Sequence, residues 1–219
     1  MWQTLLGTPK PHIIHQVLEK NQLKEKVIIV GDVHGCFEEL KDLLHKCNYS
    51  AANSTLIFVG DLVNKGPFSA ETIKFARKEG AYCVRGNHDD SMLSHALKLR
   101  ASSCKLNMFP SASYTLPNRY SYVYDLNNDD INWVKELPYT LSIPTLNAVV
   151  VHAGLIPGVK LENQNATDMY MLRNLIYTNG KKIVGTSKAV EGEPWASLWA
   201  RIDTSPTHVF FGHDAKRGE

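Results

Sequence analysis

The sequence predicts an α/β protein in which helices cover the faces of a sheet. Five short apolar runs, rich in β-branched residues, each lead to a glycine, and these are KVIIVG (26–31), STLIFVG (54–60), AYCVRG (81–86), NAVVVHAG (147–154) and THVFFG (207–212). Because the runs are apolar throughout rather than alternating, they indicate strands buried on both faces. Helical patterns separate the first three runs, and this alternation is typical of an α/β sheet.

Four helices are predicted around these strands. The first, over residues 36–47, places its apolar side chains on one stripe. The second, over 69–80, begins with Ser69 as its N-cap and ends at Gly80. Two further helical patterns cover 89–101 and 128–136, and the last of these leads the chain back to the sheet.

The stretch from 102 to 127 shows no clean period. It contains Pro110 and Pro117 together with scattered aromatic side chains, which are Phe109, Tyr114, Tyr120, Tyr122 and Tyr124. We interpret it as an insertion that forms a cap over the site. The chain of 219 residues suits one core of ordinary size, so residues 1–219 are predicted to form a single domain.

Composition excludes several classes of protein. Apolar residues make up 43% of the chain and charged residues 21%, as in a globular protein rather than a disordered one. The formal charge of +2 gives no strong nucleic-acid signature. We expect no membrane span and no signal peptide. The four cysteines form no CxxC pair, which favours free thiols and a cytoplasmic location.

Polar side chains follow all five predicted strands, and they are Asp32 and His34, then Asp61, then Asn87 and His88, then His152, then His213. In open α/β sheets ligands bind beyond the carboxyl ends of the strands, so we expect these groups at one edge of the sheet. Any one of them alone is more often a turn residue or a core histidine. Five strand ends in series outweigh that interpretation and predict a site.

The mixture of oxygen and imidazole donors indicates which ions this site would hold. It suits Mn²⁺, Fe or Zn²⁺ and suits Ca²⁺ poorly. Two ions about 3.5–4 Å apart could clamp a phosphate and activate a water molecule. A bridging carboxylate would come from the middle of the set, and Asp61 is the natural choice.

The blocks GDVHG, GDLVNKG, GNHD, HAG and GH, spread from 31 to 214, resemble the calcineurin-like metallophosphoesterases, in their phosphoprotein-phosphatase branch. The resemblance implies an αββα sandwich with mixed sheets. It implies two divalent ions, Mn²⁺ first, with Fe, Zn²⁺, Co²⁺ or Mg²⁺ as alternatives. One ion would be held by Asp32, His34, Asp61 and His213, and the other by Asp61, Asn87 and His152. His88 would be the general acid, and water would attack phosphorus without a phosphoenzyme.

Departures from the sequence pattern of that branch narrow the range of expected substrates. Asn64 and Lys65 stand where protein phosphatases carry Asp-Arg, and Asp89 stands where they carry Glu. The pattern is more similar to the ApaH-like phosphatases, relatives of the symmetrical diadenosine-tetraphosphate hydrolases. This implies hydrolysis of phosphoanhydride bonds in a dinucleoside polyphosphate or capped nucleotide, or of a phosphomonoester. Three alternatives stay open: a protein Ser/Thr phosphatase, a non-catalytic scaffold and a nuclease.

Further residues complete the predicted site. Lys65 can pair with phosphate as a compact charge. Arg85, and Arg173 in a helix-like stretch, are candidates for substrate binding, and Asp89 is a candidate for orienting His88. Family members continue past GHDAKRG with more strands, so we expect the C-terminal strands to be missing here. The oligomeric state is left open.

Overall fold

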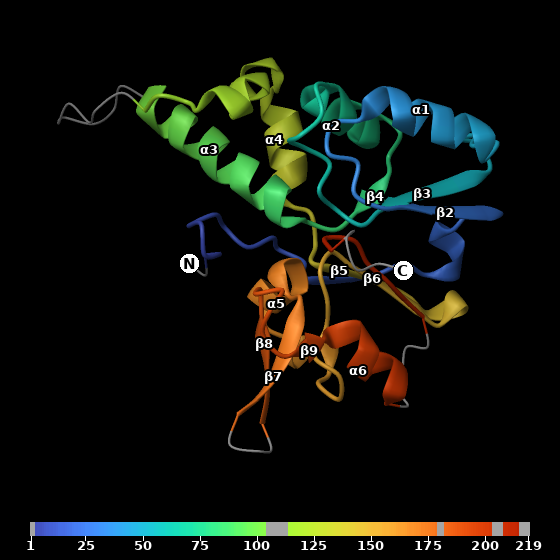
Figure 1. The fold of residues 1–219 in the computed structure, drawn as a ribbon. Coiled ribbons are helices and arrows are strands. Elements are labelled where there is room, and N and C mark those ends of the chain that lie inside the picture. Colours follow the sequence, from blue (N-terminus) through green and yellow to red (C-terminus); the bar gives the residue numbers. More distant parts are fainter. Residues whose placement is uncertain (1–2, 104–113, 179–181, 203–207, 215–219) are drawn as a thin grey trace.

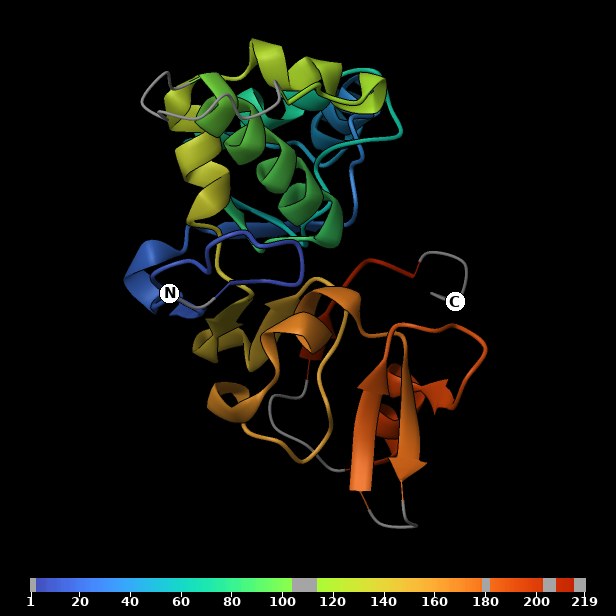
Figure 2. The same cartoon turned by 90° about the vertical axis from the view of Figure 1, so that its left-hand side faces the viewer.

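The computed structural model describes residues 3–103, 114–178, 182–202 and 208–214. Two sheets lie one above the other, with helices on their outer sides, and both views show this layering (Figures 1 and 2). The first sheet is parallel, in the order β2-β3-β4, and consists of β2 (Lys26–Val30), β3 (Ser54–Phe58) and β4 (Tyr82–Cys83).

The second sheet is mixed. Its order is β1-β5-β6-β10, from β1 (His15–Val17), β5 (Thr140–Ile143), β6 (Ala148–Val151) and β10 (His208–Phe210). β5 and β6 are antiparallel, whereas β1 and β10 each run parallel to their neighbour. A third, antiparallel sheet has the order β8-β7-β9, from β7 (Asn174–Thr178), β8 (Lys182–Thr186) and β9 (Glu193–Pro194).

The side chains of β3 point alternately to the two faces of the first sheet, and this explains how the layers pack together. Successive side chains of a strand point to opposite faces. Ile57 therefore packs between the two sheets, against Leu141 of β5 and Val150 of β6. Its neighbours Leu56 and Phe58 pack on the other face, in the cluster that the helices cover. The strand is buried on both faces, as its apolar run predicts.

Four α-helices cover the outer face of the first sheet (Figure 1), and they are α1 (Phe37–Lys46), α2 (Ser69–Lys78), α3 (Asn87–Ser103) and α4 (Asn128–Lys135). The short helices α5 (Ala166–Met171) and α6 (Trp195–Arg201) lie beyond the second sheet. The 3-10 helices of the described ranges are η1 (Lys20–Gln22), η2 (Asn118–Asp125), η3 (Pro144–Leu146) and η4 (Leu161–Asn163).

Local sequence accounts for the helix boundaries. Asn127 caps α4, because its side chain accepts from the backbone N–H of Asp130 while the Asp130 side chain accepts from the N–H of Asn127. Ser69 is the first residue of α2 rather than its N-cap, which is Phe68. The Ser69 hydroxyl instead accepts a hydrogen bond from the backbone N–H of Asn64 at 2.9 Å. Ser69 therefore holds the loop that carries Asn64 in place.

The α/β fold with mixed sheets agrees with the predicted class, but the strand ends do not belong to one sheet. β2, β3 and β4 lie in the first sheet, whereas β6 and β10 lie in the second. Within the predicted cap, residues 104–113 lie outside the described residues, and η2 packs Tyr120 and Val123 onto the helical core. No helix in the described ranges is long and apolar enough to cross a membrane.

Candidate metal centre

Sharp turns after the strands bring the candidate ligands together. His34 and Asp61 both have a φ of 51°, and His213 has a φ of 66°. Left-handed conformations of this kind cost about 1–3 kcal/mol each outside glycine and cluster at functional sites. The first two turns are bonded to each other, because the carbonyl of Asp61 accepts from the backbone N–H groups of Val33 at 3.2 Å and His34 at 2.8 Å.

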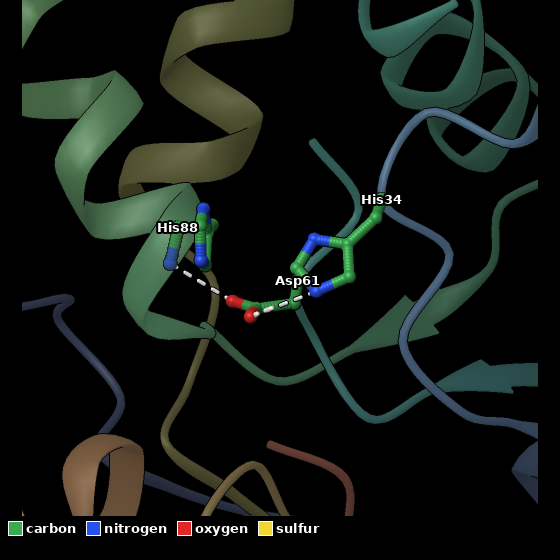
Figure 3. A group of neighbouring side chains, drawn as sticks. All are labelled: His34, Asp61 and His88. Atoms are coloured by element: carbon green, nitrogen blue, oxygen red, sulfur yellow. Dashed lines mark hydrogen bonds and ion pairs between the residues drawn. The ribbon is translucent and has the colours of Figure 1, made fainter. Parts of the chain in front are cut away.

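One group of donors forms where β2, β3 and α3 meet. His34 Nε2 lies 3.6 Å from Asp61 Oδ2 and 3.7 Å from Asp32 Oδ2. The backbone N–H of His88 donates to Asp61 Oδ1 at 2.8 Å. Figure 3 shows the side chains of His34 and Asp61 converging beside His88. The nearest ligand atoms of His34, Asp61 and His88 all lie within 4.8 Å of one another.

A second group adds the histidines of the other sheet. Asp61, His152 and His213 also offer ligand atoms within 4.8 Å of one another, with His152 Nε2 3.4 Å from Asp61 Oδ1. Asn87 Oδ1 lies 3.0 Å from His152 Nε2 and 2.9 Å from His213 Nδ1. Asp61 belongs to both groups, as expected of a bridging carboxylate. The grouping differs from the family pattern, because His213 lies with His152 rather than with His34, although its backbone N–H donates to Asp32.

The surroundings of these donors fit metal ions. His34 Nδ1 lies 3.0 Å from the carbonyl of Val63, and His152 Nδ1 lies 2.9 Å from that of Val59, so in each ring Nε2 is the nitrogen that faces the other donors. His213 Nε2 is buried and has no hydrogen-bond partner within the described parts of the chain. A Cβ on Gly86 would lie 2.2 Å from Asp61 Oδ1, so only glycine admits this carboxylate.

Burial shifts the pKa values of these groups in opposite directions. Burial and then the neighbouring Asp32 raise the pKa of Asp61 to about 8. Burial, followed by His34 and Lys65, lowers the pKa of His88 to about 4. Burial is also the main cause that lowers the pKa values of His34, His152 and His213. The imidazoles are therefore neutral near pH 7, which is the form that binds a metal ion, and a bound cation would favour the ionised form of Asp61 that burial and Asp32 disfavour.

Asn64 orients His88. The Tyr122 hydroxyl donates to Asn64 Oδ1 at 2.8 Å, and Asn64 Nδ2 lies 3.0 Å from His88 Nδ1. With its oxygen occupied by the tyrosine, the amide donates to Nδ1, so the proton of the neutral His88 ring sits on Nε2. A loop in which Asn64 and Lys65 both have positive φ, 70° and 69°, presents this amide.

Two of the basic side chains predicted to bind substrate, Lys65 and Arg173, lie near the proposed metal centre. Lys65 Nζ lies 2.6 Å from His34 Nε2. Arg173 forms an ion pair with Asp214, Nη1 to Oδ1 2.7 Å, one residue beyond His213, and its charge contributes to the lowered pKa of His213. Arg173 lies between α5, which ends at Met171, and β7, so the helix-like stretch predicted to contain it is helical only before Arg173.

Asp89 is buried beneath the loops rather than facing substrate. Its carboxylate accepts three backbone N–H groups, from Asp61 at 2.8 Å, Leu62 at 3.0 Å and Gly86 at 3.0 Å. Burial and then Asp61 raise its pKa to about 7. The described residues contain no hydrogen bond between Asp89 and His88, and the orienting role expected of Asp89 belongs to Asn64 instead. Asp89 joins the loop after β3 to the start of α3.

Arg85 does not reach the centre, in contrast to its predicted role in substrate binding. The side chain is 0% exposed, and Nη1 donates to the carbonyl of Pro9 at 3.0 Å and to Asp90 Oδ1 at 3.3 Å. Nη2 donates to the carbonyl of Lys135. A guanidinium so occupied joins the N-terminal segment, α3 and α4, and is not available to a phosphate.

We expect Arg85→Lys to destabilise the protein by about 1–3 kcal/mol, because lysine cannot reach all three acceptors and leaves buried oxygens unsatisfied. Chemical denaturation measures this loss, and the KM for p-nitrophenyl phosphate should stay unchanged. Arg77→Lys is the matched control, since Arg77 pairs with Asp130 but is 35% exposed. If Arg85→Lys instead raised the KM and left the free energy of unfolding unchanged, Arg85 would have to contact substrate.

Sequence reasoning missed the contribution of η2. Tyr122 and Arg119 line a pocket together with Asn64, Lys65 and His88. The aromatic residues of 102–127 were the available signal, but without a period they did not indicate which of them faces the site.

Similarity to known proteins extends over most of the chain. A model of the calcineurin-like phosphoesterase family matches residues 25–217. The symmetrical bis(5'-nucleosyl)-tetraphosphatase of Vibrio vulnificus (strain CMCP6) is 34% identical over 131 residues, which are 59% of this chain and 44% of that protein. The enzyme of the same name from Aromatoleum aromaticum is 35% identical over 142 residues, 64% of this chain and 48% of that protein. The chain thus spans about half the length of the curated relatives it matches.

A solved structure gives a fuller match. The crystal structure of a protein assigned as a diadenosine tetraphosphatase superposes with a TM-score of 0.75 at 34% identity. The superposition covers 94% of this chain and 82% of that one. The similarity therefore extends beyond the segment shared with the curated relatives.

Proposed function

Because this chain belongs to the calcineurin-like phosphoesterase family, we propose that it hydrolyses phosphoanhydride bonds of a dinucleoside polyphosphate or a capped nucleotide. Membership confirms the resemblance drawn from the five sequence blocks, and with it the predicted class of fold. One observation carries the proposal: Asp61 is shared by two donor groups, with His34 Nε2 3.6 Å from its Oδ2 and His152 Nε2 3.4 Å from its Oδ1. The names of the relatives support the substrate class.

The proposed cofactors are two divalent cations, with Mn²⁺ first and Fe, Zn²⁺, Co²⁺ or Mg²⁺ as alternatives. Mixed carboxylate, amide and imidazole donors support this choice. The proposed ligands are Asp32, His34, Asp61, Asn87, His152 and His213. When bound, such ions would supply positive charge to the phosphate and lower the pKa of water.

The side chains of this protein would do the rest. His88 carries its proton on Nε2, and this N–H would donate a hydrogen bond to the leaving oxygen, which keeps the electron pair of the broken P–O bond. Asn64 and Tyr122 hold His88 in the required tautomer. Lys65 would pair with the phosphate, and Arg173, held by Asp214, would add positive charge nearby. The oxygen of a water molecule would form the new P–O bond while its proton passes to solvent, so no phosphoenzyme forms.

We expect hydrolysis of diadenosine tetraphosphate and of p-nitrophenyl phosphate to require an added divalent ion, because the ions held by Asp32, Asp61 and the other proposed ligands would supply the positive charge and lower the pKa of the attacking water. Activity should appear with Mn²⁺, disappear with EDTA and return when Mn²⁺ is restored. A panel with capped RNA and a phosphopeptide ranks the substrates. Full activity in metal-free protein would overturn the mechanism, and absence of Mn²⁺ binding in calorimetry would favour a scaffold.

We also propose that residues 1–219 belong to one domain, which the match over 25–217 supports. A reducing compartment, such as the cytoplasm, is proposed because Cys36, Cys47 and Cys83 carry free thiols.

A further inference from the structure

We propose that the pocket beside His88 is the subsite for the leaving group, and that it takes an anionic leaving group bearing phosphate, such as a nucleotide. This inference rests on the proposed function and identifies which part of the substrate the pocket binds. The pocket has a volume of about 530 Å³. It lies between the loop that carries Asn64 and Lys65 and the helix η2, with His88 in its wall.

The walls of this pocket are held in place without a ligand. Tyr120 of η2 is 2% exposed, and its hydroxyl lies 2.6 Å from Ser91 Oγ of α3. Tyr122 donates to Asn64, which links η2 to the opposite wall. Both walls are therefore tied to the elements that carry His88. A pocket with fixed walls loses less entropy on binding than a mobile surface does.

The polar lining of the pocket is positively charged. Lys65 comes from one wall and Arg119 from the other, and the described lining residues include no carboxylate. Arg119 lies over the ring of Tyr120, with its guanidinium carbon 4.9 Å from the ring centroid. It forms no ion pair with a carboxylate in the part of the chain that the structure describes. An exposed guanidinium that lies over an aromatic ring and pairs with no carboxylate there can still offer two N–H groups to two phosphate oxygens.

The position of His88 indicates that Lys65 and Arg119 would contact the leaving group rather than the phosphate that is attacked. Its ring lies 4.8 Å from that of His34, centroid to centroid, so the reacting phosphorus would sit among the metal-centre residues. A proton donor acts on the oxygen that departs, and in an in-line displacement that oxygen lies opposite the attacking water. Groups attached to that oxygen therefore extend past His88 into the pocket. A serine or threonine side chain would bring no charge to Arg119 and Lys65, whereas a nucleotide brings its phosphates.

The test compares two substrates that differ in the leaving group. In Arg119→Ala, we expect the ratio of kcat/KM for diadenosine tetraphosphate to kcat/KM for p-nitrophenyl phosphate to fall about 10-fold or more, because one charge-assisted contact is lost. Arg119→Lys should recover part of the ratio. Lys98→Ala, which removes the same charge from an exposed position on α3 outside the pocket, should leave the ratio within about two-fold.

The outcomes separate this inference from the proposed function. An unchanged ratio in Arg119→Ala, with both substrates hydrolysed, would overturn the subsite and leave the phosphoanhydride activity standing. If the Mn²⁺-loaded wild type hydrolyses neither substrate, the proposed function fails, and ADP binding then decides on the subsite. A Kd for ADP about 10-fold weaker in Arg119→Ala, by calorimetry with Mn²⁺ present, supports the subsite, and an equal Kd contradicts it.

Discussion

His88→Asn is expected to lower kcat by about 10²- to 10⁴-fold, the usual contribution of a positioned proton donor. His88 lies beside Asp61 at the start of α3, and Asn64 fixes its tautomer through Nδ1. Asparagine removes the Nε2 donor but keeps the backbone N–H that binds Asp61 Oδ1. The loss should therefore appear in kcat, while Mn²⁺ should still raise the melting temperature of the variant.

The matched control is His95→Asn, the same substitution two turns along α3. His95 contacts Tyr114 and Tyr120 rather than the metal centre. We expect its kcat to stay within about two-fold of the wild type, since it lies outside the donor groups. Equal losses in both variants would point to damage to α3, and a His88→Asn enzyme with full kcat would remove His88 from the mechanism.

Asp61→Asn is expected to abolish both activity and the stabilisation that Mn²⁺ gives. Asp61 is 2% exposed and is shared by the two donor groups. An amide offers one neutral oxygen where a carboxylate offers two charged ones. At Mn²⁺ concentrations 100 times Kd, binding adds about 2.7 kcal/mol to the wild-type free energy of unfolding. The variant should show almost none of this gain in thermal denaturation.

In the absence of metal, the same variant should be more stable than the wild type at pH 9. The pKa of Asp61 is raised to about 8 by burial and Asp32, so the folded protein holds its proton more tightly than the unfolded chain does. The stability contributed by the neutral carboxyl is complete below the unfolded pKa of about 4 and is lost as pH rises to about 8. The amide of the variant stays neutral throughout, and the two unfolding curves should therefore diverge across this range.

Asp168→Asn is the control for this comparison. Burial raises the pKa of Asp168 as well, but this residue lies in α5, outside the donor groups. Its Mn²⁺-dependent stabilisation should equal that of the wild type. A metal gain that survives in Asp61→Asn would show that Asp61 bridges no ions.

The strands that lead to the candidate metal ligands could be predicted because each one is marked by a short stretch of its own sequence. Each of the five runs is apolar and ends at glycine, and each proved to contain a strand. β1 and β5 escaped prediction because they are three and four residues long and include polar side chains. β7 was missed because its residues Leu175 and Ile176 continue an apparently helical pattern from α5, although the helix ends at Met171.

The roles of polar residues near the centre were less predictable, because they depend on direction. Arg85 directly precedes the strand-end glycine, Gly86, yet its side chain points to the carbonyls of Pro9 and Lys135, which are distant in sequence. Asp89 is one residue from His88 but turns toward the loop after β3. A sequence pattern identifies which residues share a loop, and packing of the remote segments decides where each one points.

The candidate metal ligands come from two different sheets, and this has a consequence for how the protein unfolds. Asp32 and Asp61 follow strands of one sheet, whereas His152 and His213 follow strands of the other. Ions held by both sets would cross-link the sandwich, so separating the sheets would require releasing them. Backbone amides of β3 and β6 should then exchange with deuterium independently in metal-free protein and slow together, as one cooperative unit, once Mn²⁺ is bound.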